Sequence, residues 1–182
     1  MEKSNCDSDE IKMIVGLGNP DEEYKNTYHN VGRLFLDELT KKAGGKSIYK
    51  FPNGKDFGFI KIRNFVLVVS KTYMNESGLA VDQALKYFKN KPKEMIVVHD
   101  DSDKEIGTYK KTFAQSSGGH KGVESIIKII ESQDFYRIKI GIRPQEETIR
   151  KKASDFVLNK ITKRDKEIFD KIFDEIINSI NI

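Results

Sequence analysis

Cysteine is almost absent from this chain of 182 residues. The single cysteine, Cys6, rules out a disulfide within the chain and excludes a small disulfide-stapled scaffold. No stretch approaches the ~20 apolar residues that a membrane-spanning helix needs. The first ten residues contain neither the apolar core of a secretion signal nor an arginine-rich amphipathic pattern. These absences predict a soluble protein that works in the reducing cytoplasm, with no membrane contact.

The chain also lacks an internal repeat and any linker long enough to divide it. Residues 1–10 are polar and carry a net negative charge, and we expect them to form a frayed, disordered tail. Residues 11–182 are expected to form one domain. Hydrophobic residues make up 37% of the chain and charged residues 33%, so this composition predicts a packed core beneath a heavily charged surface.

Apolar residues alternate between strand spacing and helical spacing along the chain. Short runs of apolar residues predict strands at 13–15, 57–62, 65–69, 95–98, 107–113 and 136–142. Helical spacing predicts helices at 31–42, 79–88, 123–131 and 168–180, with a short helical patch near 156–158. We expect Gly44 and Gly45 to end the first helix and Ser77 to cap the second. This alternation predicts a single α/β domain with a mixed, twisted β-sheet flanked by helices.

Positive charge is concentrated in two segments, although the formal net charge is only +4. Seven Lys and Arg residues stand against one acid from Lys41 to Arg63, and six stand against two acids from Arg137 to Lys152. In residues 136–142, isoleucines alternate with basic residues, which predicts a strand with one apolar and one basic face. Such segments suit a polyanion, but a lysine-rich chain also shows such runs without any binding function.

The stretch from Met13 to Asn30 places several chemically useful side chains near the end of a predicted strand. Gly16 and Gly18 allow a sharp turn, and Asn19 follows where ligands of open α/β sheets collect. Together with Tyr24 and His29, this predicts an amide, a phenol and an imidazole at one site. A dinucleotide-binding glycine loop is an alternative interpretation, but its third glycine is missing and Pro20-Asp21 stands in its place.

Polar side chains follow other predicted strands as well. Asn75 precedes the second helix, Asp100 follows the strand at 95–98, and His120 lies in a glycine-rich loop. Each has a simpler interpretation: Asn75 as a helix cap, Asp100 as the first residue of a turn, and His29 as a cap or surface side chain. These alternatives stay open for each residue taken alone.

Four separated motifs, in this order, resemble bacterial-type peptidyl-tRNA hydrolases. The motifs are GLGNP at 16–20 with Tyr24 and TYHN at 27–30, TYMNESG at 72–78, HDD at 99–101 and GGHKG at 118–122. The strand RIKIGIRP at 137–144 also matches, and the resemblance spans roughly residues 12–182. The sequence departs from the family pattern at four positions, where Gly, Arg, Pro and Asn are usual: Asp21, Tyr28, Ser70 and Lys121.

The resemblance implies hydrolysis of the ester that joins a peptide to the 3′ ribose of tRNA. The substrate would be peptidyl-tRNA from stalled or aborted translation, and the reaction would free the tRNA for reuse. His29 is expected to act as general base and Asp100 to orient its imidazole. Asn19 and Asn75 are expected to bind the substrate, with Asn19 also counted among the catalytic residues because it separates blocked from free aminoacyl-tRNA.

The expected contacts with tRNA involve aromatic and basic side chains. Tyr24 and Tyr73 are expected to pack against the 3′ end, and His120 and Lys121 to contact substrate nearby. Three further cations are expected to contact phosphates: Lys110, Lys139 and Arg143. We expect no cofactor, no metal and no obligate protein partner, and a monomeric state.

Two rival hypotheses belong to other functional classes. A divalent-metal site has acceptable ligand types, although no HExxH or similar spacing is present; its ligands would be His29, His99, Asp100, Asp101, Asp103 and His120. A non-catalytic RNA-binding module would keep the basic strand but would not need His29 or Asp100. The aromatic signature of an RRM is absent from residues 136–142.

Overall fold

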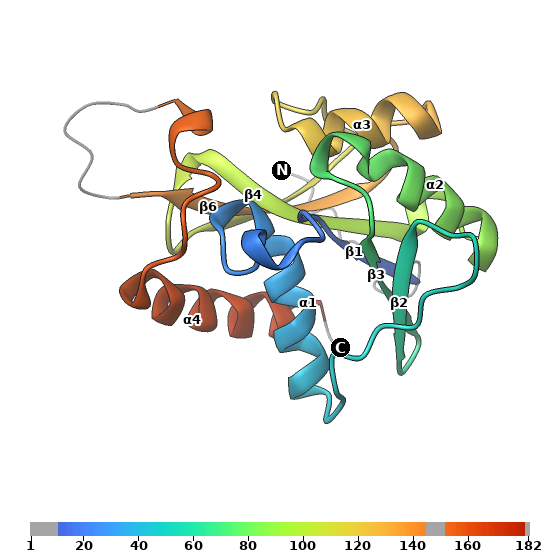
Figure 1. Ribbon diagram of the computed structural model, residues 1–182, viewed down its shortest axis with the longest axis horizontal. Coiled ribbons are helices and arrows are strands. Elements are labelled where there is room, and N and C mark those ends of the chain that lie inside the picture. Colours follow the sequence, from blue (N-terminus) through green and yellow to red (C-terminus); the bar gives the residue numbers. More distant parts are fainter. Residues whose placement is uncertain (1–10, 145–151, 181–182) are drawn as a thin grey trace, which may run out of the picture.

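The computed structural model describes residues 11–144 and 152–180, and the expected N-terminal tail lies outside this part (Figure 1). Its centre is a mixed six-stranded sheet with the order β2-β3-β1-β4-β6-β5. The inner four strands are parallel, whereas β2 and β5 run antiparallel at the two edges. The strands are β1 (Met13–Gly16), β2 (Phe57–Ile62), β3 (Phe65–Ser70), β4 (Met95–Glu105), β5 (Tyr109–Phe113) and β6 (Tyr136–Arg143).

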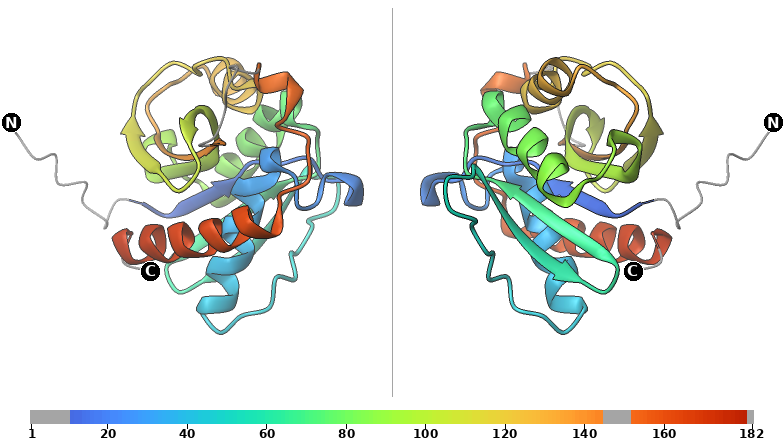
Figure 2. Two further views of the ribbon diagram at one scale, coloured as in Figure 1. Left: turned by 90° about the vertical axis from the view of Figure 1, so that its left-hand side faces the viewer. Right: turned by 90° about the vertical axis from the view of Figure 1, so that its right-hand side faces the viewer.

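Helices cover both faces of the sheet, as the two views of Figure 2 show. The α-helices are α1 (Val31–Lys42), α2 (Ser77–Phe88), α3 (Lys121–Ile130) and α4 (Lys163–Ser179). One buried apolar cluster joins the sheet to α1 and α4, and a second joins the other face to α2 and α3. The near-continuous apolar runs of the inner strands follow from this two-sided burial. None of the helices in the described part of the chain is long and apolar enough to span a bilayer.

Most predicted elements are present, with boundaries close to those expected. The first helix begins and ends where predicted, and it stops at Gly44, which adopts a left-handed φ of 76°. Ser77 does not cap α2. Its hydroxyl instead donates to the carbonyl of Met74, 2.8 Å away, so it belongs to the first turn of the helix.

Three segment predictions need correction. Strand β4 continues through residues 99–101 to Glu105, because this segment still pairs with β6. Strand β5 begins at Tyr109 and not at residue 107, since Gly107 adopts a positive φ that breaks the strand. The short helical turn before α4 lies at Ala153–Asp155, slightly earlier than expected.

The predicted basic face of β6 is not a solvent-exposed surface. Arg137 is fully buried, and its guanidinium has no hydrogen-bond partner within the described residues. Arg143 is also buried, and its Nε donates to the carbonyl of Ser102. The alternation in the sequence identified the two faces of the strand, but on the basic face both arginines are buried.

Close packing fixes where α1 begins. A Cβ atom on Gly32 would lie 2.2 Å from the carbonyl oxygen of Val98 and 2.7 Å from the amide nitrogen of Leu17. The helix therefore approaches the end of β1 and the middle of β4 at a distance that only glycine permits. This contact places the residues just before α1 next to the middle of β4.

We predict that Gly32→Ala destabilises the domain by about 3 kcal/mol, at the upper end of over-packing costs, because the neighbouring backbone atoms cannot yield. Urea unfolding of the variant and the parent measures this difference. Lys41→Ala, at an exposed position of the same helix, serves as the control and should change stability by less than about 0.5 kcal/mol. Equal stability of the two variants would show that α1 can move away from the sheet.

Candidate active site

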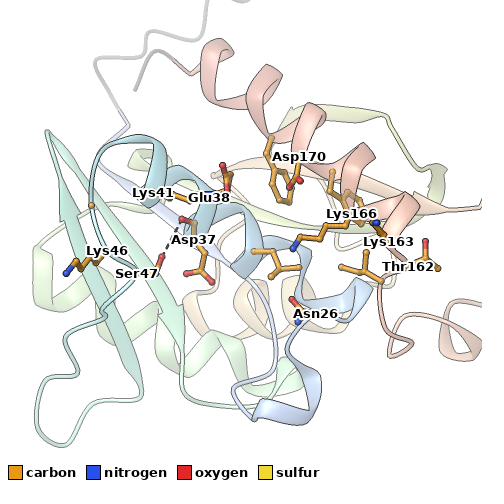
Figure 3. A pocket seen from close by; sticks show the side chains of 15 residues that line it. Asn26, Asp37, Glu38, Lys41, Lys46, Ser47, Thr162, Lys163, Lys166 and Asp170 are labelled. Atoms are coloured by element: carbon orange, nitrogen blue, oxygen red, sulfur yellow. Dashed lines mark hydrogen bonds and ion pairs between the residues drawn. The ribbon is translucent and has the colours of Figure 1, made fainter.

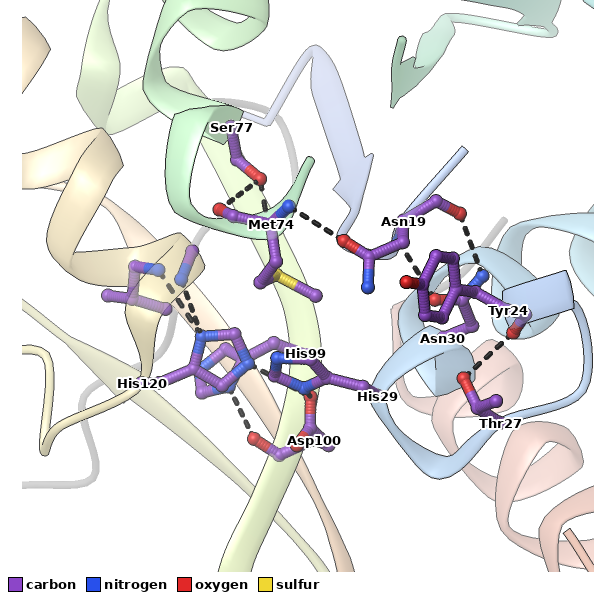
Figure 4. Close-up of polar contacts among 12 residues, drawn as sticks. Asn19, Tyr24, Thr27, His29, Asn30, Met74, Ser77, His99, Asp100 and His120 are labelled. Atoms are coloured by element: carbon purple, nitrogen blue, oxygen red, sulfur yellow. Dashed lines mark hydrogen bonds and ion pairs between the residues drawn. The ribbon is translucent and has the colours of Figure 1, made fainter. Parts of the chain in front are cut away.

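Three segments far apart in the sequence meet at the middle of β4, just beyond Val98, the last β4 residue paired with β1 (Figure 4). His29 comes from the 3-10 turn η3 (Tyr28–Asn30) that leads into α1, and Asp100 lies on β4. His120 is the N-cap residue of α3. Ligand sites of α/β sheets form at this edge because parallel strands all end there.

Asp100 holds both imidazoles through one carboxylate oxygen. His29 Nδ1 lies 2.8 Å from Asp100 Oδ1, and His120 Nε2 lies 2.9 Å from the same atom. Asp100 is only 3% exposed, so an unpaired carboxylate here would be strongly unfavourable. The two hydrogen bonds therefore stabilise the buried charge and fix both rings.

The hydrogen bonds also determine which ring nitrogens carry protons. His120 Nδ1 accepts from the backbone N–H groups of Gly122 and Val123, which leaves the proton on Nε2 for donation to Asp100. His29 donates to Asp100 from Nδ1, so its Nε2 carries the lone pair when the ring is neutral. That nitrogen has no hydrogen-bond partner in the described structure, and His29 lines the adjacent cavity.

Burial and charge act against each other on these groups. Burial disfavours the charged form of His29, but the Asp100 carboxylate outweighs this and raises the pKa of the imidazole above its ordinary value. Burial alone would raise the pKa of Asp100, whereas the charges and hydrogen bonds of His120 and His29 hold it well below its usual range. Asp100 is therefore ionised, and His29 titrates above its ordinary pKa.

His99 lies behind the pair of imidazoles and is not suited to be a base. Burial, and after it the neighbouring imidazole of His120, holds the pKa of His99 well below its ordinary value. Its Nδ1 lies 2.7 Å from the backbone carbonyl of Asp100, to which it donates when neutral, and its Nε2 is buried. The ring packs edge-on against His120, with centroids 4.5 Å apart, and so forms a wall of the site.

One hydrogen bond orients the carboxamide of Asn19, and two more hold its backbone. Its Oδ1 accepts from the backbone N–H of Met74 at 2.8 Å, which identifies the other side-chain atom as the nitrogen. Asn30 holds the backbone of Asn19 from both sides, because its Oδ1 accepts from the Asn19 N–H and its Nδ2 donates to the Asn19 carbonyl. The amide nitrogen of Asn19 has no partner in the described structure and remains available as a donor (Figure 4).

A cavity of about 670 Å³ opens beside His29 and Asp100. Four lysines and the glycine-rich loop at 117–119 contribute to its lining, the lysines being Lys104, Lys110, Lys121 and Lys139. Lys139 Nζ lies 3.9 Å from the Asp101 carboxylate, and Lys121 Nζ lies 3.2 Å from that of Glu124 on the surface. Arg143 does not line this cavity, because it is bound to Ser102 and stacks over Phe156.

The predicted aromatic residues lie together on the other side of Asn19. Tyr24 and Tyr73 are in edge-to-face contact with ring centroids 6.4 Å apart, and the Tyr73 hydroxyl donates to Asp21 at 2.6 Å. Asn75 is exposed on the turn η4 (Met74–Glu76) and does not line the cavity beside His29. Its contact with substrate stays a prediction.

Both ring nitrogens of His120 are occupied by Asp100 and by the first turn of α3. The structure thus suits His120 to hold Asp100, whereas the sequence predicted a substrate contact. Sequence reasoning also missed Asn30, whose position directly after His29 was the only signal. It gave no role to the fully buried Arg137 beneath the cavity.

Three of the candidate metal ligands do meet in the structure. Donor atoms of His29, Asp100 and His120 lie within 4.8 Å of one another, which a metal ion could bridge. The N–O separations of 2.8 and 2.9 Å are hydrogen-bond distances, and the backbone bonds to His120 Nδ1 require a proton on its other nitrogen. The donor set is therefore accounted for by hydrogen bonding.

A second and larger cavity, of about 760 Å³, lies between α1 and α4 (Figure 3). Its floor is apolar, with Leu34, Phe169 and Phe173 among the lining residues, and charged side chains of both signs surround it. No residue predicted for the active site is among the described residues that line it. The convergence of candidate catalytic groups, and not cavity size, therefore favours the cavity beside His29 as the candidate site.

Comparison with known proteins identifies the same architecture elsewhere. A sequence model of the family described as peptidyl-tRNA hydrolase matches residues 13–182. The peptidyl-tRNA hydrolase of Sulfurihydrogenibium sp. (strain YO3AOP1) is 43% identical over 166 residues, covering 89% of this chain and 85% of that protein. That of Aquifex aeolicus is 37% identical over 173 residues, covering 94% and 88%. The crystal structure of peptidyl-tRNA hydrolase from Acinetobacter baumannii superposes with a TM-score of 0.81 at 30% identity, covering 94% of this chain and 87% of that one.

We predict that Asp100→Asn lowers the pKa of His29, because an amide cannot stabilise the imidazolium while burial still opposes it. A pH titration of the His29 ring signal by NMR measures the shift. Asp101→Asn, one residue along the strand, is the matched control and should leave the pKa of His29 unchanged. An unaltered titration of His29 in Asp100→Asn would mean that the carboxylate does not act on this imidazole.

Proposed function

The chain belongs to the peptidyl-tRNA hydrolase family and is an enzyme that hydrolyses peptidyl-tRNA, and we propose that His29 is its general base. One observation carries this assignment: Asp100 binds His29 through Nδ1 and leaves Nε2 open to the cavity. A neutral imidazole with a free lone pair beside a cavity can take a proton from water.

The proposed reaction needs only groups of this chain and one water molecule. The water oxygen attacks the carbonyl carbon of the ester while its proton passes to His29 Nε2. The Asn19 amide donates a hydrogen bond to the developing oxyanion, as in other acyl-transfer sites. The intermediate then breaks the bond between carbon and the ribose oxygen, which takes the proton from His29. The products are a peptide carboxylate and tRNA with a free 3′ end.

Asp100 supports this cycle without giving up its own charge. Its carboxylate fixes the Nδ1 tautomer of His29 and stabilises the imidazolium that forms during attack. His120 holds the carboxylate from the other side and carries its second hydrogen bond. Asp100 and His120 are therefore proposed as positioning residues, because they act through His29.

The lysines around the cavity are proposed to bind the tRNA backbone. Lys110, Lys121 and Lys139 lie on its lining from two strands and one helix, so several phosphates near the 3′ end could be contacted at once. Tyr24 and Tyr73 present aromatic faces near Asn19 on which a terminal base could stack. Arg143 is left out of this set, because its side chain is bound within the protein.

We place the activity in the cytoplasm, on peptidyl-tRNA released from stalled or aborted translation, because that is where such a substrate arises. The proposed chemistry uses an imidazole, a carboxylate and an amide, so it calls for no cofactor. The monomeric state and the independence from protein partners stay predictions.

We predict that His29→Ala lowers turnover of N-acetylated aminoacyl-tRNA by about 100-fold or more, the usual range for loss of a general base. Binding of the same tRNA, measured by filter retention, should stay within about twofold because the base contacts no phosphate. Assays with and without a chelator, and with unblocked aminoacyl-tRNA, separate this mechanism from a metal-dependent one. A variant that retains more than about a tenth of the activity would remove His29 from the role.

We further predict that Lys139→Ala weakens binding to all tRNA species about equally. The slope of log K against log salt should become shallower by about one unit, through the loss of one phosphate contact. Lys86→Ala on α2, where the side chain pairs with Asp82 away from the cavity, is the control and should leave the slope unchanged. A selective loss for one tRNA species would contradict a contact with the backbone alone.

A further inference from the structure

The segment that carries His29 is held by the chain just before α4. The backbone N–H of His29 donates to the carbonyl of Val157 at 2.8 Å, and that of Tyr28 donates to Asn159 at 3.3 Å. Thr27 and Lys160 form an antiparallel bridge, so residues 26–29 and 157–161 pair over a short distance. The position of His29 therefore depends on hydrogen bonds to residues 157–161 as well as on its attachment to α1.

One side-chain contact also joins the segment at residues 26–29 to α4 itself. The hydroxyl of Tyr28 donates to Asp165 Oδ2 at 2.5 Å, and Tyr28 is only 7% exposed. Its ring also packs against Phe169, one turn further along α4, with centroids 6.3 Å apart. Burial and the hydrogen bond to Asp165 raise the pKa of Tyr28 to about 12, so the phenol stays a neutral donor at working pH.

The acceptor of this hydrogen bond is itself fixed in place. Asp165 lies in the first turn of α4, and its backbone N–H donates to the hydroxyl of the capping residue Thr162 at 3.1 Å. This capping bond anchors the first turn of α4 and with it the backbone that carries the carboxylate. Tyr28 is also one of the four positions at which this chain departs from the family pattern, where arginine is usual.

We propose that the hydrogen bond between Tyr28 and Asp165 positions the catalytic base. Tyr28 directly precedes His29, so a rotation of the Tyr28 backbone moves the imidazole relative to Asp100 and the cavity. The contact holds the residue directly before the base, and α4 thereby belongs to the framework of the active site. This inference rests on the proposed role of His29 and deepens it.

The chain offers a matched control for this contact. The hydroxyl of Tyr49 donates to Asp37 Oδ1 at 3.2 Å, on the side of α1 away from the catalytic cavity. Both pairs join a partly or fully buried phenol to a carboxylate on a helix. Tyr28→Phe and Tyr49→Phe therefore remove similar hydrogen bonds, and only the first removes one next to His29.

We expect Tyr28→Phe to lower kcat by about tenfold with an unchanged KM, since small displacements of a catalytic group cost up to about 100-fold. Tyr49→Phe should leave kcat within about twofold, even where thermal unfolding shows a similar loss of stability in both variants. Asp165→Ala should reproduce the effect of Tyr28→Phe, and the double variant should be no worse than either one. Asp165→Asn keeps an oxygen acceptor and should retain kcat within about threefold of the parent.

Two results would overturn the proposal. Equal kcat in Tyr28→Phe, Tyr49→Phe and the parent would make the contact purely structural. Additive losses in Tyr28→Phe and Asp165→Ala would show that the two side chains act separately. If Tyr28→Phe does not fold, the more exposed Asp165 decides the question through its Ala and Asn variants. Loss of activity in His29→Ala together with an unchanged kcat in Tyr28→Phe would refute this inference and leave the proposed function intact.

Discussion

A single buried carboxylate oxygen organises the candidate active site of this protein. Asp100 accepts hydrogen bonds from the imidazoles of His29 and His120, which are far apart in the sequence. Because its pKa is lowered in the folded state, this interaction stabilises the fold above the carboxyl's unfolded pKa and is lost as pH falls. The raised pKa of His29 has the opposite sign, and its contribution is lost as pH rises through the folded value. The ion pair between Asp100 and His29 therefore contributes most to stability at pH values between the titration of Asp100 and that of His29.

The rest of the structure serves to bring these groups within reach of one another. Parallel strands deliver Asn19 and Asp100 to the same edge of the sheet, and Gly32 lets α1 approach closely enough for His29 to meet β4. The N-cap of α3 supplies His120, whose second nitrogen is occupied by the helix backbone. Each functional side chain is thus also part of a local backbone structure, which limits its freedom to move.

The four positions expected from the sequence to depart from the family pattern each take part in a specific contact. Asp21 accepts from the Tyr73 hydroxyl, and Tyr28 donates to Asp165. Ser70 accepts from the backbone N–H of Thr72 at 2.9 Å, while its own carbonyl accepts from Arg33. Lys121 pairs with Glu124 on the surface of α3. These contacts link loops to neighbouring elements around the site and leave His29, Asp100 and Asn19 in place.

The sequence by itself determined the fold class and most element boundaries, and it predicted which groups would be central to the site. Strand and helix periodicity depend on local spacing, and four ordered motifs named His29, Asp100 and Asn19 before any contact was known. Only the tertiary structure decided which of the other polar residues are buried, which are exposed and which partners they bind. Arg137 and Arg143 share a strand face with Lys139, but burial removes the two arginines from solvent and leaves Lys139 on the cavity. The roles of His120, Asn30 and Tyr28 likewise depend on partners 11 to 137 residues away. Such contacts leave no local pattern, because a hydrogen bond between distant segments is set by how helices and strands pack and not by the residues beside it.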